Sequence, residues 1–134
     1  MIWLLDTNTI IYAQYVGGRV RDRLDEASKK GRVVTSVLVI AELFYGAAKS
    51  SRPDANRRKV EEVVRAIDVL PITIGSAARF GTLKQELGSR GRVKADIDLH
   101  IAATAIEQGA TLVTNDGALL SADIDGLASE NWIL

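Results

Sequence analysis

Short apolar runs alternate with longer amphipathic stretches along the chain, and this alternation is typical of an α/β protein. Five of the short runs predict strands, at residues 2–5, 32–35, 68–72, 110–114 and 131–134. The third would lie at an edge or end at Pro71, and the last, NWIL, would be an edge strand. Because helices separate the strands, we expect a three-layer fold with a central, mostly parallel sheet.

The longer stretches predict six helices between these strands, at residues 8–16, 19–30, 37–49, 53–67, 75–91 and 94–109. Gly17 and Gly18 separate the first two helices, and Pro53 suits the first turn of the fourth. Ser36 can cap the third helix, whose sequence VLVIAELFYGAAK is apolar almost all round. A helix of that composition is expected to be buried.

The composition predicts one compact domain that spans residues 1–134. The chain is 47% hydrophobic, with 2 prolines and no cysteine, so disulfides, zinc–thiolate sites and thiol nucleophiles are excluded. A single histidine, His100, also excludes a histidine-rich metal site. Asp6 interrupts the N-terminal apolar run, which has no basic residues before it, and no run reaches the roughly 18 residues of a membrane span. We therefore expect a soluble, cytoplasmic protein without a membrane segment.

Charged residues balance overall but are unevenly placed. There are 17 basic and 17 acidic residues, which argues against a protein that coats polyanions in general. The basic residues gather at 19–23, 52–59 and 90–94. Mixed-sign surface helices are the simplest interpretation of these groups.

Four carboxylates stand in apolar surroundings, where an ionised acid is costly unless it is paired, hydrogen-bonded or bound to a metal. Asp6 and Asp116 each follow a strand at its carboxyl end, although a helix cap or a turn would explain either of them alone. Glu42 has only apolar residues within four positions, apart from the amphipathic Tyr45. Asp98 shares a helical stripe with Ile101, Ala102 and Ala105, so it should face the packed side of its helix.

Two neighbours of Asp98 are expected to have other roles. Asp96 should cap the start of the helix, with only a minor chance of contact to the site. His100 projects about 200° away from Asp98 around the helix. We interpret His100 as a packing or surface residue, and not as a catalytic base.

Carboxylates that converge on one edge of a sheet repel each other unless cations neutralise them. Oxygen ligands without cysteine or a useful histidine favour Mg²⁺ or Mn²⁺. A bound ion of this kind can activate water, and metal-assisted hydrolysis of a phosphodiester is the natural chemistry of such a site. The basic groups could then hold the phosphate backbone on either side of it.

The segments LLDTN, TSVLVIAELFYG, DIDLHIAATAIEQGATLVTND and ENWIL together resemble the PIN-domain family, and most closely the VapC-type toxins of toxin–antitoxin pairs. The similarity covers nearly the whole chain. It implies a Mg²⁺- or Mn²⁺-dependent ribonuclease, usually homodimeric, that acts on RNA and is inhibited by a VapB-like antitoxin. The resemblance does not name the RNA or the number of ions.

The resemblance assigns roles to individual residues. The catalytic and metal-binding acids of the family fall on Asp6, Glu42, Asp98 and Asp116. Supporting polar residues are Asn8, Ser36 and Thr114. Substrate choice would depend on the shape of the groove and on residues such as Arg19, Arg90, Arg92 and Lys94.

Other classes of protein fit less well. A haloacid-dehalogenase-like phosphatase needs a second aspartate where Asn8 stands, and a receiver domain needs a lysine after a late strand. No glycine-rich loop follows the first strand, which argues against a dinucleotide-binding domain. A non-catalytic module with the same fold that binds RNA or a protein partner remains the alternative. The stretch LFYGAA beside Glu42 could dock an antitoxin, although core packing explains most of it.

Overall fold

The computed structural model of the protein describes residues 1–133. The five strands are β1 (Ile2–Leu5), β2 (Arg32–Ser36), β3 (Asp68–Leu70), β4 (Thr111–Val113) and β5 (Ala128–Glu130). The helices are α1 (Thr7–Tyr15), α2 (Gly18–Lys30), α3 (Val37–Ala48), α4 (Pro53–Ala66), α5 (Ile74–Ser89), α6 (Asp96–Glu107) and α7 (Gly117–Leu120). No helix in this part of the chain is long and apolar enough to cross a membrane.

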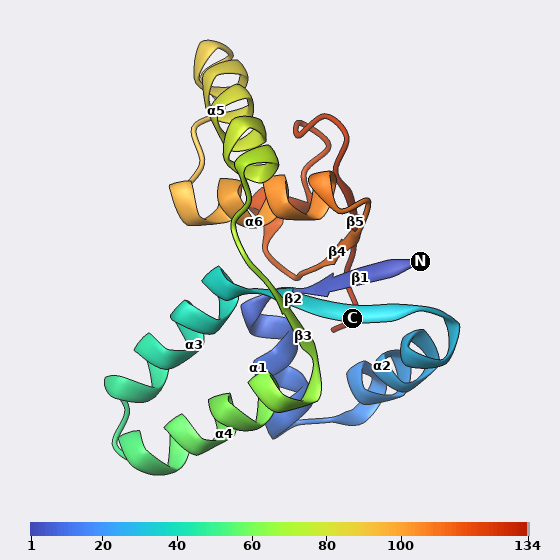
Figure 1. Ribbon diagram of the computed structural model, residues 1–134, viewed down its shortest axis with the longest axis vertical. Coiled ribbons are helices and arrows are strands. Elements are labelled where there is room, and N and C mark those ends of the chain that lie inside the picture. Colours follow the sequence, from blue (N-terminus) through green and yellow to red (C-terminus); the bar gives the residue numbers. More distant parts are fainter. Residues whose placement is uncertain (134) are drawn as a thin grey trace.

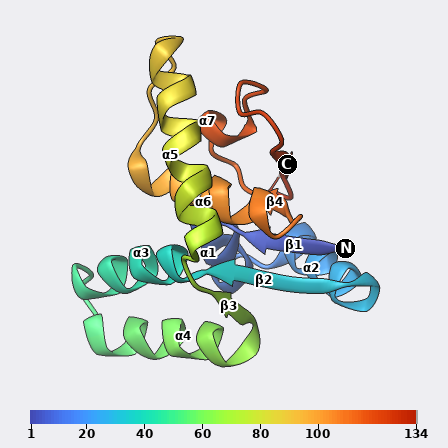
Figure 2. The same ribbon diagram turned by 45° about the horizontal axis from the view of Figure 1, so that its top comes forward.

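The strands form one parallel sheet in the order β3-β2-β1-β4-β5. Helices α5 and α6 lie on one side of the sheet, and α1, α2 and α4 lie on the other (Figures 1 and 2). The predicted three-layer α/β fold is therefore confirmed. In the central strand, Leu5 pairs with Thr35 on one side and with Val113 on the other. The carboxyl ends of β1, β2 and β4 consequently meet at one edge of the sheet, beyond which α3 extends.

The core lies between the sheet and the helix layers. Leu4, Val34 and Leu112 are fully buried in the three central strands. On α6, the alanine-rich stripe that includes Ala102 and Ala105 is also fully buried, as its spacing predicted. These small side chains allow α6 to lie close to the sheet, and this brings the first turn of α6 near the strand ends.

Two elements near the C-terminus differ from the prediction. The last strand is β5, and the prediction that residues 131–134 form it was wrong. After β5 the chain turns Trp132 into the core, where it is 1% exposed and its indole N–H donates to Glu130 Oε1. Leu134 lies outside the described residues. The short helix α7 was not predicted, because NDG is also an ordinary turn sequence.

The junction between α2 and β2 requires glycine at position 31. A Cβ there would collide with the carbonyl oxygen of Met1 and lie 3.2 Å from the ring of Trp3. That same carbonyl accepts the first inter-strand bond, from Arg32 N at 2.9 Å.

We therefore predict that Gly31→Ala lowers the free energy of unfolding by about 1–3 kcal/mol, because overpacking must displace the start of β1. Urea unfolding measures the change. Gly81→Ala is the matched control, since a Cβ at Gly81 meets nothing within 4 Å and alanine is the better helix former by about 0.5–1 kcal/mol. Equal stabilities of the two variants would contradict the prediction.

Candidate active site

Asp6 is held at the junction of β1 and α1. Its carboxylate is 7% exposed and caps α1, with Oδ1 accepting the backbone N–H of Thr7 at 2.8 Å. Its second oxygen, Oδ2, accepts the hydroxyl of Thr114 at 2.8 Å. Thr114 directly follows β4, so this bond joins the ends of two neighbouring strands. Asp6 therefore has a fixed position before any ligand arrives.

Thr114 links Asp6 to Asp116. The Thr114 hydroxyl donates to Asp6 and also accepts the backbone N–H of Asp116 at 3.0 Å. Asp116 caps α7 and accepts the backbone N–H of Ala118 at 2.9 Å. The loop after β4 therefore places the carboxylate of Asp116 at the same edge of the sheet as Asp6. Burial raises the pKa of Asp6, the bonds from Thr114 and Thr7 oppose this, and the charge of Asp116 adds to the increase.

Glu42 reaches this edge from α3. The helix begins where Ser36, buried at the end of β2, accepts the backbone N–H of Leu38 at 3.1 Å. One and a half turns later, Glu42 Oε1 accepts the hydroxyl of Thr7 at 2.8 Å. Thr7 is the residue whose N–H is bound to Asp6, so two of the predicted acids contact the same threonine.

Asp98 lies in the first turn of α6 and is partly buried. Burial, together with the negative charges of Asp116, Asp6 and Glu42, raises the pKa of Asp98 to about 6, while Lys94 acts in the opposite direction. All three of the other acids are therefore close enough to act on it electrostatically. The structure brings the four predicted acids together on one edge of the sheet, and each comes from a different element.

Three polar residues at this edge were not predicted, namely Thr9, Thr35 and Asn115. The hydroxyl of Thr9 donates to Val113 O at 3.0 Å, and that of Thr35 donates to Leu5 O at 2.7 Å. The predicted Asn8 donates from its side-chain amide to Asn115 Oδ1 at 3.1 Å. The run DTNT after the first strand was the available signal, since hydroxyl and amide side chains at strand ends commonly bond to backbone.

The predicted substrate-binding residues have diverse surroundings. Lys94 is 8% exposed and forms an ion pair with Asp123 at 3.2 Å. Arg90 donates to the backbone carbonyl of Asp123 at 2.9 Å. Both side chains thus hold the segment after α7. Arg92 and Arg19 are exposed, the latter in the first turn of α2, and a role in binding substrate stays a prediction for all four.

Two further expectations concern the start of α6. The prediction that Asp96 caps this helix was wrong, because Ala95 is the N-cap. Asp96 instead occupies the first turn and pairs with Lys84 at 3.0 Å on the surface. His100 packs as expected, with its ring stacked on Phe80 at 3.8 Å between centroids.

The four acids offer the donor set that Mg²⁺ or Mn²⁺ prefers, namely carboxylate oxygens. Their mutual repulsion, which adds to burial in raising the pKa of Asp98, is the electrostatic condition that a divalent cation relieves. Within residues 1–133, no group of three or more acidic or histidine side chains is already arranged to hold an ion. A Mg²⁺ site commonly uses one or two carboxylates and completes its shell with water, so the residues present fit such an ion.

Comparison with known proteins gives a consistent picture. Residues 3–124 match the PIN domain family. The chain is 34% identical over 132 residues to ribonuclease VapC2 of Haemophilus influenzae, covering 98% of each chain. It is 33% identical over 131 residues to the tRNA(fMet)-specific endonuclease VapC of Shigella flexneri, covering 97% of each chain. The crystal structure of VapBC2 from Rickettsia felis bound to a DNA fragment from its promoter is similar with a TM-score of 0.90 at 32% identity, covering 98% of this chain and 99% of that one. The chain therefore belongs to the PIN-domain family, and within that family to the VapC proteins.

The raised pKa of Asp98 predicts a pH-dependent stability. Its carboxyl binds a proton more tightly in the folded chain than in the unfolded chain, so protonation stabilises the fold. The contribution of the Asp98 proton to the free energy of unfolding is complete below pH 3.8, the ordinary pKa of an aspartate, and is lost as the pH rises to about 6. The Asp98→Asn variant carries no charge at this position, so it should not lose this stability. In EDTA at pH 7 it should therefore be more stable than the parent, as measured by urea unfolding. Asp96→Asn serves as the control, and parallel pH profiles for the parent and Asp98→Asn would contradict the prediction.

Proposed function

We propose that the protein is a Mg²⁺- or Mn²⁺-dependent endoribonuclease that acts as the toxin of a toxin–antitoxin pair. The observation that carries the proposal is the convergence of four acids at one edge of the sheet, where burial and the charges of the other three acids raise the pKa of Asp98 to about 6. Relatives named as a ribonuclease and as a tRNA(fMet)-specific endonuclease support RNA as the substrate. The homodimer that the resemblance implies stays a prediction.

In this proposal Asp6 and Asp98 are the principal metal ligands, with Glu42 and Asp116 completing the acidic site. When bound, the ion would supply charge neutralisation and water activation, which are the usual contributions of divalent metals to phosphodiester hydrolysis. The chain contributes preorganisation, because Thr114 and Thr7 fix the Asp6 carboxylate and Thr7 also fixes Glu42. Two of the four carboxylates are thus oriented in advance and need not reorganise during the reaction.

A carboxylate that is not committed to the metal can also accept a proton from an attacking water. Glu42 and Asp116, which complete the acidic site beside the two principal ligands, are the candidates for this role.

The main alternative is a PIN fold that binds RNA or a partner without cleaving it. Nothing in the acid site favours it, because all four acids of the family pattern are retained. The two proposals differ in what happens when a carboxylate becomes an amide, since only a nuclease needs the negative charge.

We predict that Asp6→Asn, Glu42→Gln and Asp98→Asn each lower the rate of RNA cleavage by about 100-fold or more, and that EDTA abolishes it. Cleavage of labelled RNA by the purified chain with Mg²⁺ or Mn²⁺ measures the effect. Asp96→Asn, on the same helix but paired with Lys84 on the surface, should cleave normally. Cleavage at parental rates by the three amide variants would refute the mechanism.

A metal-dependent rise in melting temperature, lost in Asp98→Asn, tests the ion site without a substrate.

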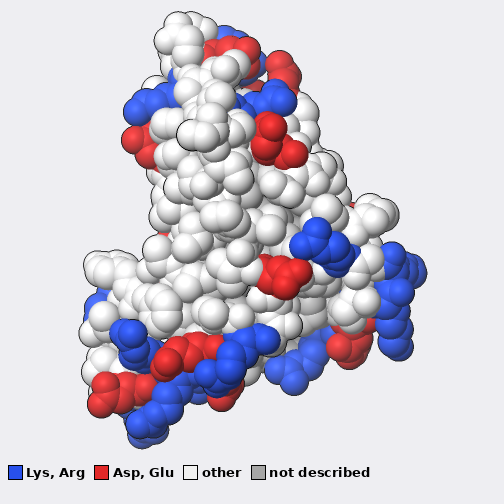
Figure 3. All heavy atoms as spheres, in the orientation of Figure 1, with Lys and Arg blue, Asp and Glu red and all other residues white. Residues whose placement is uncertain are grey.

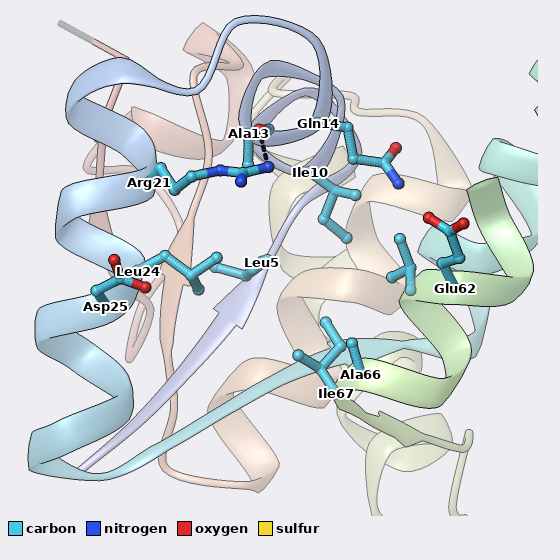
Figure 4. A pocket seen from close by; sticks show the side chains of 11 residues that line it. Leu5, Ile10, Ala13, Gln14, Arg21, Leu24, Asp25, Glu62, Ala66 and Ile67 are labelled. Atoms are coloured by element: carbon cyan, nitrogen blue, oxygen red, sulfur yellow. Dashed lines mark hydrogen bonds between the residues drawn. The ribbon is translucent and has the colours of Figure 1, made fainter.

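An apolar groove between α1, α2 and α4 is the best surface for an antitoxin segment. Its volume is about 370 Å³, and Leu5, Ile10 and Leu24 form part of its floor (Figure 4). Arg21 crosses one end and donates to Ala13 O at 3.1 Å. Relatives of this chain are known in VapBC complexes, among them those of Rickettsia felis and Salmonella typhimurium.

The LFYGAA stretch is the less suitable surface. Leu43 and Ala47 are buried in the core, and Tyr45 is the large side chain of this stretch that is mostly exposed, at 68%. The expectation that core packing explains most of this stretch therefore agrees with its burial. An apolar segment of a partner finds more concave surface beside α2.

Ala66 is exposed at the end of α4 that lines this groove. We predict that Ala66→Glu weakens the complex with the antitoxin by roughly tenfold or more, because it places a charge against apolar contacts. Co-expression with the product of a neighbouring gene, followed by titration of the purified partners, measures it. Ala55→Glu, exposed at the other end of α4, is the control. RNA cleavage should stay unchanged in both variants. Equal binding by Ala66→Glu and the parent would show that the antitoxin binds another surface.

A further inference from the structure

A second, more polar groove opens beside Glu42. It lies between α1, α3 and α4 and has a volume of about 190 Å³, enough space for one nucleobase. Its walls include Tyr15 from α1, Glu42 and Gly46 from α3, and Asn56 and Lys59 from α4. Glu42 also belongs to the acidic site, where it accepts the hydroxyl of Thr7, so this side chain lies between the groove and the other acids.

Tyr15 provides an aromatic surface at this groove. Tyr15 is 56% exposed as a residue, and the ammonium of Lys59 lies over its ring at 4.3 Å from the centroid. Its hydroxyl is 3.4 Å from Asn56 Oδ1, to which it donates. Asn56 is held in turn by donating to Ser50 Oγ at 2.9 Å. The groove therefore combines an aromatic ring, a cation next to it and an oriented side-chain amide.

Gly46 adds no side chain to the part of the groove that α3 lines. It lies in the interior of α3, four residues after Glu42 and on the same face of the helix. A Cβ at this position would meet no heavy atom within 4 Å. A larger side chain would therefore extend into the groove without disturbing the helix backbone, and the absence of one keeps the groove open.

We propose that this groove receives the nucleobase next to the cleaved phosphodiester of a single-stranded RNA. In this arrangement the base stacks on the ring of Tyr15 and uses the space that Gly46 leaves free, while Lys59 neutralises the adjoining phosphate. The inference rests on the proposed ribonuclease function and adds to it a nucleotide-binding position and the residues that form it.

The chemistry of the groove favours RNA over a protein segment. Aromatic rings beside cations are the usual means of holding single-stranded nucleic acid, because the ring stacks on a base and the cation meets the backbone. An apolar segment of a partner would gain little here, since Asn56, Lys59 and Glu42 present polar groups that it would desolvate. The surface of α4 carries charges of both signs (Figure 3), so the specific feature is the Tyr15–Lys59 pair and not a general positive field.

The test compares intact and abasic RNA. A short single-stranded RNA oligonucleotide of mixed sequence is first mapped for its cleavage site, and each nucleotide that flanks this site is then replaced by an abasic one. For the parent, loss of one of these bases should raise KM by roughly 5- to 150-fold, the equivalent of one stacked base. For Gly46→Leu, which fills the groove, intact RNA should already show the raised KM, and removal of the base should add little.

Two further variants and one control separate the groove from the fold. Tyr15→Ala should reproduce the effect of Gly46→Leu, and Tyr15→Phe should restore the parental KM because the ring remains. Gly81→Leu places the same side chain at an open helical position on α5 and should leave KM unchanged. A raised KM in Gly81→Leu, or a parental KM in both Gly46→Leu and Tyr15→Ala, would overturn the inference. So would a Gly46→Leu variant that binds RNA normally but no longer binds the antitoxin, since a protein segment would then occupy the groove.

The outcome also distinguishes this inference from the proposed function. If the parent fails to cleave RNA with Mg²⁺ or Mn²⁺, the ribonuclease itself is refuted. If the parent cleaves and tolerates abasic substitution on both sides of the bond, only the nucleotide-binding groove is refuted.

Discussion

Electrostatic repulsion among four carboxylates at one edge of a parallel sheet is the constraint on which the rest of the structure depends. Each acid alone could be tolerated as a cap or a surface charge. Together, the charges of the other three acids add to the effect of burial in raising the pKa of Asp98, and a chain that keeps the acids together must hold them by other means. Hydroxyl groups supply much of that support, since Thr114 and Thr7 bond directly to Asp6 and Glu42. Such neutral donors orient a carboxylate without cancelling its charge, which stays available to a cation.

The topology explains why sequence-distant acids meet. In a parallel sheet the carboxyl ends of the strands share one edge, and the switch in strand order at β1 opens a crevice there. Asp6 follows the central strand, and Thr114 and Asp116 follow its neighbour β4. The alanines of α6 allow close packing against the sheet, which places Asp98 over the same edge. Small residues in the core therefore help to position an acid of the candidate site.

The sequence predicted these placements to different extents. Strand ends and helix faces follow from periodicity, so the location of Asp6, Asp98 and Asp116 could be predicted from pattern alone. Glu42 stood out because its helix is otherwise apolar. The contacts that orient the acids could not be predicted, because the bond from Thr7 to Glu42 spans 35 residues and depends on how α1 and α3 approach each other. Strand β5 was missed for a similar reason, since the burial of Trp132 is a tertiary effect that outweighs local strand propensity.

Helix α1 joins the acid site to both grooves. Its N-cap is Asp6 and it ends at Tyr15, so one helix of nine residues sets the position of the acidic edge relative to the aromatic ring. Gln14 lines the apolar groove on one side and the polar groove on the other, and its amide donates to the carbonyl of Lys59 at 3.1 Å. This bond ties α1 to α4 at the point where the two grooves adjoin. The spacing between the acidic edge and the two grooves is therefore set by the packing of α1 against α4.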